Sequence, residues 1–407
     1  MNRRVVITGM GAICALGHDA RSMWQGMREG RGAIAPLAGF EDHADLRVRV
    51  AAQVRDYDPL AHFDEKKLLL LDRVSQFALI AAREAVAQSG LDFATDEALR
   101  ARTACIVGTG TGGEQTNDEA SRRLYKEGNP RLHPFSIVRR MVNAPASQVS
   151  IAFGAGGPSF AVSSACASAN HALAQAFGLV RSGTCDVALA GGTEACITLG
   201  VLRAWEAMRV LADDTCRPFC KQRRGLVLAE GAGMFVLEDF DHARARGAEI
   251  LAEFAGAGMS ADAGDIVLPS DAGAARAIRS ALDDARLNAS DVDYINAHGT
   301  GTRDNDLTET RAIRKVFGEH AGSLAVSSTK SMHGHALGAA GALELVAAIG
   351  SLRDQVVPPT ANFLDPDPEC DLDYVPNTPR EREVRAVLSN AFAFGGLNAV
   401  VALRRVS

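Results

Sequence analysis

Short β-type runs alternate with longer helical patterns along the whole chain, and this alternation constrains the fold more than any other feature. Apolar, β-branched runs predict strands, and helical periodicity predicts the helices between them. The predicted strands are 4–8, 104–108, 159–163, 187–190, 234–238, 250–259, 294–297, 325–328 and 386–390. The predicted helices are 72–89, 170–182, 241–246, 272–285, 306–317 and 336–353. The sequence therefore predicts an α/β protein whose helices cover buried sheets.

The length of the chain and the restart of this rhythm predict two halves. A chain of 407 residues is long enough for more than one core. No linker separates the halves, and the strand–helix rhythm restarts near residue 250, so we expect them at 1–250 and 251–407. Residues 111–145 and 354–380 are the least regular stretches, and the prolines of the second predict a loop.

Composition and charge exclude several classes of protein. With 47% hydrophobic and 23% charged residues, the chain resembles ordinary soluble proteins. A net charge of −6 argues against a broad nucleic-acid or anionic-membrane surface. No apolar run is long enough to span a bilayer, and the apolar stretch after Arg3 and Arg4 is interrupted by glycines, unlike a signal peptide. The eight cysteines form no CxxC pair, which favours reduced thiols and a cytoplasmic location.

Cys166 is the first candidate catalytic residue. It follows a β-type run ending at Ser163 and Ser164, and an alanine-rich helical segment follows it. A thiol in the first turn of that helix would meet free backbone N–H groups and the positive end of the helix dipole, which favour the thiolate nucleophile. The alternative is an inert cysteine that only packs in the core.

Two segments further along the chain supply histidines. His298 follows the predicted strand 294–297, while Lys330 and His335 lie between strand 325–328 and a Gly/Ala-rich helix. Such strand ends are where α/β proteins build their sites. A thiolate with two imidazoles suits thioester exchange and decarboxylation, because one step needs a nucleophile and the other needs N–H donors to an enolate oxygen.

Each of these residues has another interpretation. A histidine in a loop can be structural, and Lys330 can be a surface charge, although its small neighbours favour burial. His333 with His335 could bind a metal ion, and so could His298 with two nearby aspartates, Asp304 and Asp306. We expect no metal site. The run 108–113 fits G-x-G-x-x-G, but no strand ending in an acidic residue follows, so we expect a tight glycine turn rather than a dinucleotide site.

These segments together resemble the β-ketoacyl-acyl carrier protein synthases, the condensing enzymes of fatty acid and polyketide synthesis. The resemblance runs from Arg4-Val5-Val6-Ile7-Thr8-Gly9, through the cysteine and histidine segments, to Asn390-Ala391-Phe392-Ala393-Phe394-Gly395-Gly396. The chain is most similar to the elongating (type II) enzymes. Within them it resembles the nodulation protein E-like synthases and those that make specialised polyunsaturated acyl chains.

The resemblance implies a fold and a set of roles. The fold would be a thiolase fold, with two similar halves in a layered α-β-α-β-α arrangement, working as a homodimer or with a related subunit. Cys166 would accept the acyl group, and His298 and His335 would serve decarboxylation and condensation. Lys330 would support this pair, and Glu309 would anchor Lys330. The backbone N–H groups of Cys166 and Phe394 would form the oxyanion hole, and Phe394 would gate the acyl pocket.

The resemblance also implies substrate and partner contacts. Substrate-binding positions would be Thr300, Thr302, Thr111, Ser136, Phe392 and Val267. Val267 stands where the family has a hydroxyl residue. Thr111 and Ser136 stand where it has bulkier apolar residues, so a larger or more polar acyl pocket is expected. Three basic residues would dock an acidic acyl carrier protein: Lys66, Arg131 and Arg209.

The expected reaction is a decarboxylative Claisen condensation of an acyl-enzyme thioester with malonyl-acyl carrier protein, which gives a 3-oxoacyl-acyl carrier protein. It would need no cofactor beyond the phosphopantetheine arm of the carrier, which would enter as part of the substrate. One alternative is a non-catalytic, length-setting subunit of a heterodimeric synthase, but such subunits usually lack the cysteine. Another is a coenzyme A thiolase, which carries a second cysteine in place of one histidine; His335 argues against it.

Overall fold

The strands of the two halves of the chain lie in the same spatial order. The computed structural model describes residues 2–406 and contains a ten-stranded sheet in the order β10-β9-β13-β14-β8-β1-β7-β6-β4-β5. The first half contributes β1 (Val5–Cys14), β4 (Thr103–Gly108), β5 (Ser159–Val162), β6 (Val187–Glu194) and β7 (Gly231–Asp239). The second contributes β8 (Ala252–Ala261), β9 (Tyr294–Asn296), β10 (Ala325–Ser327), β13 (Ala386–Ala393) and β14 (Leu397–Arg404). In each half the first strand neighbours the fifth, then the fourth, second and third. The strand order before residue 250 is thus repeated after it.

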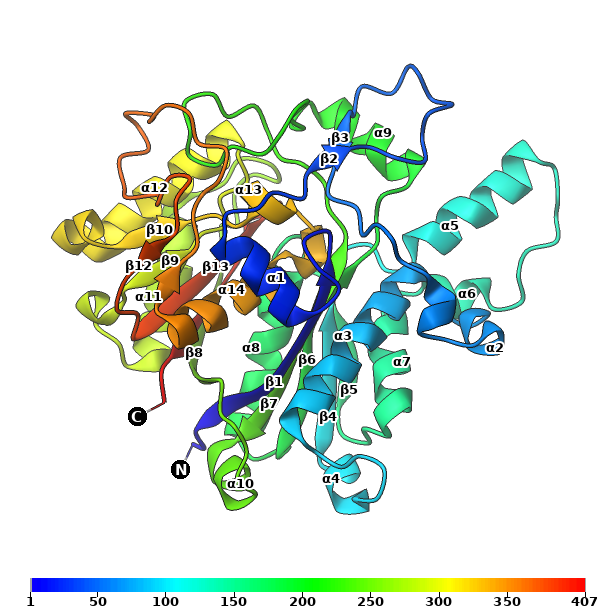
Figure 1. Cartoon of the computed structure of the whole chain (residues 1–407), viewed down its shortest axis with the longest axis horizontal. Helices are drawn as coiled ribbons and strands as arrows, with labels where there is room; N and C mark the ends of the chain where they lie inside the picture. Colours follow the sequence, from blue (N-terminus) through cyan, green and yellow to red (C-terminus); the bar gives the residue numbers. More distant parts are fainter. Residues whose placement is uncertain (1, 407) are drawn as a thin grey trace.

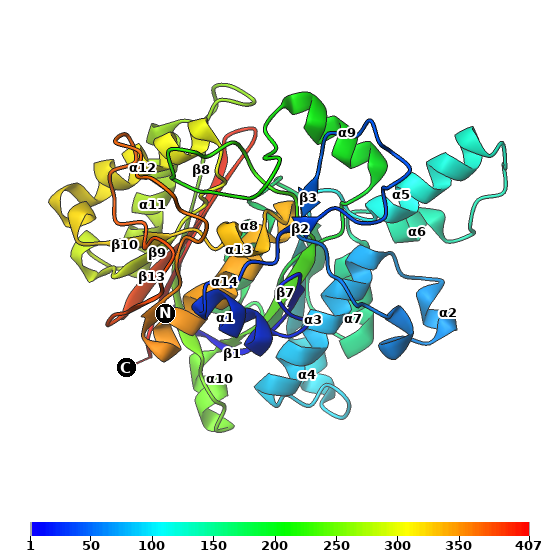
Figure 2. The same ribbon diagram turned by 45° about the horizontal axis from the view of Figure 1, so that its top comes forward.

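Helices form three layers around these strands (Figures 1 and 2). The central layer holds α8 (Ser168–Arg181) and α14 (Ala340–Asp354), which pack against strands of both halves. On one outer face, α3 (Arg73–Ser89) and α7 (Ala144–Phe153) cover the first half, and on the other α11 (Asp271–Ala285) and α12 (Arg303–Phe317) cover the second. The order is therefore α-β-α-β-α, as predicted.

Three apolar clusters hold these layers together. One surrounds α8 and α14 in the centre, the second lies beneath α3, and the third lies beneath α11 and α12. Because α14 is packed between two layers of strands, its residues from Ala340 to Leu352 are all buried. Burial of this kind is the main favourable contribution to folding, at roughly 25 cal/mol per Å² of apolar surface.

Local sequence explains where the main helices begin and end. In α3 the Asp72 side chain accepts a hydrogen bond from the Val74 N–H at 3.0 Å, and Gly90 ends the helix at a φ of +68°. In α11 the Ser270 hydroxyl caps the first turn. Side-chain caps of this type satisfy backbone groups that a helix end leaves free. Both helices lie within one residue of the predicted ranges.

The remaining elements connect this framework and include the main error of the sequence analysis. The stretch 111–145, expected to be irregular, contains three helical segments, which include an arm that projects from the body in both views (Figures 1 and 2). The stretch 354–380 is mostly loop, as predicted; it contains β11, and its two end residues belong to α14 and β12. The connecting helices are α1 (Ala20–Arg28), α2 (Glu65–Leu68), α4 (Glu97–Ala101), α5 (Glu114–Ser121), the π-helix η2 (Arg122–Lys126), α6 (Ser136–Arg140), α9 (Leu199–Met208), α10 (Phe240–Ala245) and α13 (Lys330–His333). The short elements are β2 (Ala35–Pro36), β3 (Val50–Ala51), β11 (Val356–Val357), β12 (Arg380–Glu381), and the 3₁₀ turns η1 (Pro59–Ala61), η3 (Ala289–Asp291), η4 (Gly318–Gly322) and η5 (Leu337–Ala339).

The parallel parts of the sheet bring distant segments together. Strands β4, β5 and β6 run parallel, and so do β9, β10 and β13. Cys166 follows β5, His298 follows β9, and His335 lies beyond β10. Cys166 therefore meets histidines that lie more than a hundred positions further along the chain. Within residues 2–406, no helix combines the length and the apolar character needed to cross a bilayer.

Candidate active site

Cys166 is held by a tight turn between β5 and α8. The residue before it, Ala165, has a φ of +49°. This is the left-handed region, which residues other than glycine rarely adopt. Ser168 braces this turn, because its Oγ accepts from the Ser164 N–H at 2.9 Å and donates to the Ala165 carbonyl at 2.7 Å. The first helical residue is Ser168, so the thiol lies just before the helix rather than in its first turn.

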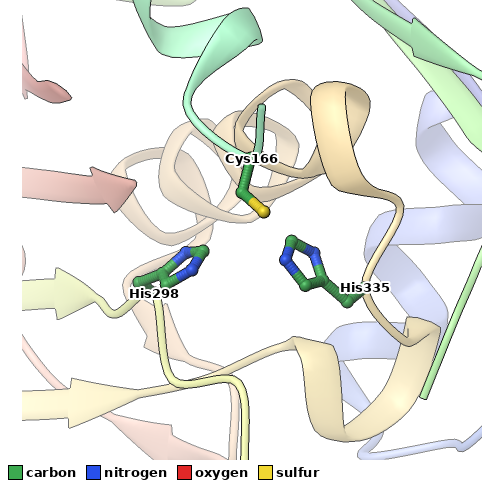
Figure 3. Close-up of side chains that lie close together, drawn as sticks. All are labelled: Cys166, His298 and His335. Atoms are coloured by element: carbon green, nitrogen blue, oxygen red, sulfur yellow. The ribbon is translucent and has the colours of Figure 1, made fainter. Parts of the chain in front are cut away.

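The thiol and the two histidines converge in a buried group (Figure 3). One donor atom from each of Cys166, His298 and His335 lies within 4.8 Å of the others. The imidazole rings meet edge to face, with centroids 5.3 Å apart and planes at 82°. All three side chains are buried. The structure therefore brings together the three residues that the sequence analysis singled out.

Burial sets the resting charges of this group. It raises the pKa of the Cys166 thiol to about 12, and the nearby Lys330 ammonium only partly opposes that rise. Burial, together with Lys330, lowers the pKa of both His298 and His335 well below 6.5. The expectation of a resting thiolate was wrong, because the loss of water around the sulfur outweighs the favourable charges nearby. The free enzyme holds a thiol and two neutral imidazoles.

Lys330 is buried, as predicted, but its carboxylate partner is not the predicted one. The Lys330 side chain is 0% exposed, and its Nζ lies 3.4 Å from the Nδ1 of His298. It forms an ion pair with Glu344 on α14, whose side chain is also 0% exposed. Burial raises the pKa of Glu344 to about 7, while the lysine opposes that rise. A buried ammonium beside His298 is the arrangement that keeps an imidazole uncharged.

Glu309 supports the histidine segment instead of anchoring Lys330. From α12 its carboxylate accepts hydrogen bonds from the backbone N–H groups of His298 at 2.9 Å and Gly299 at 2.8 Å, and from Asn390 Nδ2 at 3.0 Å. These bonds fix the turn that follows β9. The predicted role of Glu309 was wrong in its partner; burial raises the pKa of its carboxyl group, and the nearby lysine is one of the groups that oppose this rise.

The sequence analysis missed Glu344. Its signal was available, because it is the one charged residue in the apolar run 336–352. A lone carboxylate on an otherwise apolar helix needs a buried partner. The pattern alone does not say which buried cation that partner is.

A cavity of about 320 Å³ opens beside the three side chains. Four of the six predicted substrate positions line it: Thr300, Thr302, Phe392 and Val267. The predicted gate Phe394 and the basic residue Arg209, at the mouth, line it as well. The hydroxyl groups of Thr300 and Thr302 are 2.8 Å apart. The Phe394 ring lies 5.9 Å from the Trp205 ring, centroid to centroid. Trp205 was not identified from the sequence.

Four other predicted residues do not line this cavity. The Thr111 hydroxyl donates to Glu194 at 2.6 Å, and the Ser136 hydroxyl donates to the His133 carbonyl at 2.7 Å beside a separate small hollow. Lys66 lies on the short helix α2 and Arg131 in the loop before α6, and both are exposed. Their proposed roles at the acyl pocket and the carrier surface therefore remain predictions.

The other metal and nucleotide interpretations find no support in the described part of the chain. His333 is fully buried and its Nε2 lies 3.0 Å from the Thr329 hydroxyl. Asp306 accepts from the Phe219 N–H at 2.7 Å. The glycine run is a packing turn, because a Cβ on Gly108 would lie 2.4 Å from the Ser168 carbonyl carbon and oxygen. Neither His333 nor Asp306 belongs to the group formed by Cys166, His298 and His335.

Comparison with known families gives matches to both halves of the chain. The model of "Beta-ketoacyl synthase, N-terminal domain" matches residues 2–243, and that of "Beta-ketoacyl synthase, C-terminal domain" matches residues 251–364. Together they contain Cys166, His298 and His335.

Individual proteins are similar over the full length. The chain is 54% identical over 406 residues to "Nodulation protein E" of Rhizobium meliloti (strain 1021), covering 100% of both. It is 40% identical over 411 residues to "3-oxoacyl-[acyl-carrier-protein] synthase 2" of Staphylococcus aureus (strain COL), covering 99% of both. A solved structure described as a type II polyketide acyl carrier protein in complex with its ketosynthase has a TM-score of 0.89 at 32% identity, with full coverage of both chains.

Proposed function

The chain belongs to the beta-ketoacyl synthase family, and from this premise we propose how its own residues carry out the family's condensation reaction. The protein is an acyltransferase-type condensing enzyme of fatty acid or polyketide chain elongation. One observation supports the roles that we give to single residues: Cys166, His298 and His335 converge beside one cavity (Figure 3).

The first step transfers an acyl group to Cys166. Its thiol attacks the carbonyl carbon of the acyl-carrier thioester and gives up its proton to a neutral imidazole nearby. The carbon–sulfur bond to the carrier then breaks, and the departing carrier thiolate takes that proton. A general base within reach is needed because burial holds the free thiol protonated. The backbone N–H groups of Cys166 and Phe394 would hold the oxyanion.

The second step forms the carbanion. Malonyl-carrier enters, its carboxylate leaves as carbon dioxide, and the bonding electrons pass to the thioester carbonyl as an enolate. The N–H groups of the neutral His298 and His335 donate to the enolate oxygen. Each such donor is worth on the order of 10²–10³ in rate. Burial keeps both imidazoles uncharged, and Lys330 adds to this effect. The negative charge that their N–H groups stabilise is that of the enolate, which forms only during the reaction.

The third step joins the two chains. The enolate carbon attacks the carbonyl of acyl-Cys166, the Cys166 thiolate leaves, and a 3-oxoacyl-carrier two carbons longer is released. The thiolate then takes a proton and the resting thiol returns. We propose that no metal or organic cofactor takes part, and that the phosphopantetheine arm arrives with the carrier. The length-setting, non-catalytic alternative is not favoured, because all three reactive groups are present.

Acyl carrier protein is the partner of this reaction. Arg209 lines the mouth of the cavity together with Arg224 and Arg303, and this positive charge suits the phosphate of a phosphopantetheine arm. We assign carrier docking to Arg209, with Lys66 and Arg131 as outer contacts. Phe394 would move aside from Trp205 to admit the second substrate.

The acyl substrate would be a specialised chain. The identity of 54% to a nodulation protein, against 40% to a synthase named for 3-oxoacyl-carrier formation, supports this choice. Thr111 and Ser136, which stand where the family has bulkier apolar residues, are where the difference would lie. We further propose a cytoplasmic location and a homodimer. In keeping with the location, all eight cysteines are unpaired and buried.

Two products of one assay test the mechanism. Wild type incubated with acyl- and malonyl-carrier is expected to release carbon dioxide and form the 3-oxoacyl product. Cys166→Ala is expected to release carbon dioxide without condensation, and His335→Ala to lose on the order of 10²–10³ in carbon dioxide release. His320→Ala, a histidine outside the cavity, serves as the control. If wild type and Cys166→Ala both fail to condense and to decarboxylate, the catalytic assignment is wrong.

A further inference from the structure

The three reactive side chains are also a set of ligands that zinc prefers. Zinc is bound by cysteine sulfur at about 2.3 Å and histidine nitrogen at about 2.0–2.1 Å, commonly in a tetrahedral arrangement. Ligand atoms on one such ion are therefore roughly 3.3–3.6 Å apart. In this site all pairs of donor atoms already lie within 4.8 Å, so rotations that move them by about 1 Å suffice.

The donors are groups that a metal ion can bind. A ring nitrogen of each imidazole lies within 4.8 Å of the Cys166 sulfur, so each can offer its lone pair to an ion there. In His298 the Nδ1 faces Lys330 at 3.4 Å, which leaves Nε2 for another contact. The thiol becomes a ligand by exchanging its proton for the metal: Cys–SH and Zn²⁺ give Cys–S–Zn⁺ and a proton that passes to water.

The surroundings balance the charge of a divalent ion. Lys330 places one buried positive charge next to His298, but two buried carboxylates lie close by: Glu344 is paired with Lys330, and Glu309 accepts from the His298 N–H. Together with a Cys166 thiolate they outnumber the ammonium. A cation at the sulfur would therefore not face an uncompensated positive charge.

The cavity provides access and a fourth coordination position. Cys166, His298 and His335 all line it, and it opens past Arg209 and Trp205. Zinc sites with three protein ligands keep one position for water or another small ligand. A hydrated ion can thus enter from the cavity and retain one water facing it.

We propose that zinc binds the resting enzyme at Cys166, His298 and His335 and inhibits it reversibly. The ion occupies the nucleophile and both N–H donors, so neither acyl transfer nor decarboxylation can proceed. Acylation destroys the site, because the sulfur of a thioester carries no negative charge to give to the metal. Zinc binding and acyl loading are therefore mutually exclusive.

Calorimetric titration of the purified enzyme with zinc chloride tests the site directly. Wild type is expected to bind one ion per chain, with release of a proton. Cys166→Ala is expected to lose this binding, and His335→Ala to weaken it by more than about tenfold, the scale on which even indirect changes at metal sites act. Cys185→Ala, which removes another buried thiol, should bind as wild type does. Magnesium chloride should not bind, since Mg²⁺ prefers oxygen ligands.

Three further measurements test the site by other readouts. Cobalt(II) chloride should give the near-ultraviolet thiolate-to-metal absorption in wild type and not in Cys166→Ala. Enzyme loaded with an acyl group or alkylated at Cys166 should bind neither metal, and a chelator should restore activity to the inhibited wild type. Equal zinc binding by wild type and Cys166→Ala, or equal binding by the acylated enzyme, would overturn the proposal.

Discussion

At the scale of single residues, the site depends on uncharged groups held beside charged ones. Burial keeps Cys166 as a thiol and both histidines as neutral imidazoles, while Lys330 stays paired with Glu344. A neutral imidazole carries both a donor and an acceptor, so the same pair can take a proton from sulfur and donate to an enolate oxygen. The lysine therefore acts through the histidines.

Replacing Lys330 tests this electrostatic role. In Lys330→Met burial still lowers the pKa of His298 and His335, but that pKa should rise, because the positive neighbour that adds to the effect of burial is gone. On acidification, decarboxylation should then begin to fall at a higher pH than in the wild type, whose histidines remain neutral further down. A pH profile of carbon dioxide release measures the difference.

The same substitution has a stability cost that a second variant separates. Lys330→Met leaves Glu344 buried without its partner, which costs about 3–5 kcal/mol. Lys330→Met with Glu344→Gln should recover most of that stability but keep the altered pH profile. An unchanged profile in both variants would contradict the role given to Lys330.

The residues of the site were predictable to different extents. Cys166, His298, His335 and Lys330 stand in short segments at strand ends, so the sequence indicates them. The partner of Lys330 was mistaken, because Glu309 and Glu344 lie on different helices and only the tertiary fold decides which carboxylate meets the ammonium. Charges in the site were also misjudged, since exposure of the thiol cannot be obtained from a local pattern.

At the scale of elements, the site is positioned by the close packing of β4 against the start of α8. Gly108 ends β4 where the backbone of Ser168 passes, and a Cβ there would lie 2.4 Å from its carbonyl atoms. Ser168 is also the residue that braces the turn before Cys166. The position of the nucleophile is therefore coupled to a single glycine one strand away.

A substitution at Gly108 should affect both stability and activity. Gly108→Ala is expected to lower the free energy of unfolding by about 1–3 kcal/mol, the usual cost of overpacking, and to slow acylation of Cys166. Gly178→Ala on α8 is the matched control, because no other atoms lie within 4 Å of its Cβ and helix propensity should raise stability by about 1 kcal/mol. Urea unfolding checks both, and equal stability of the two variants would contradict this account.

Elements with strong local signals were predictable, and those that depend on tertiary contacts were not. The capped helix α3 lies close to its predicted range, whereas β1 and β6 begin within one residue of their predicted starts but extend six and four residues beyond their predicted ends. The arm formed by α5, η2 and α6 was expected to be irregular, because its exposed apolar residues do not follow the helical period of a core-facing helix. Among the residues that the structure describes, these exposed apolar side chains are not covered by other parts of the same chain.

At the scale of the whole molecule, the edge of the sheet offers a surface for a second copy. Strand β5 is the last strand of the sheet, and Phe160 on it is 40% exposed. Further exposed apolar residues lie on the neighbouring α6, α7 and their connection: Ile137, Val138, Met141, Val142 and Ile151. An edge strand with exposed apolar residues is a ready site for pairing with another chain.

Charges placed on this edge should separate the proposed homodimer. Phe160→Asp with Ile137→Asp is expected to convert dimers into monomers, as measured by sedimentation velocity. Leu364→Asp changes an equally exposed apolar residue away from this edge and should leave the dimer intact. A wild type that sediments as a monomer would show that the homodimer is wrong.

The layered architecture itself follows from the sequence more directly than its details do. The restart of the strand–helix rhythm near residue 250 predicts two similar halves, and the two sets of five strands have the same order. The depth of the acyl pocket does not follow, because Thr111 and Ser136 face their own neighbours within this chain.

The most direct test of the account is to identify the residue that carries the acyl group. Wild type is incubated with acyl-carrier alone, and its peptides are then analysed by mass spectrometry. The account predicts one acyl group per chain, on the peptide that contains Cys166, and none on the other seven cysteines. An acyl group on any other residue, or an enzyme that condenses without one, would contradict it.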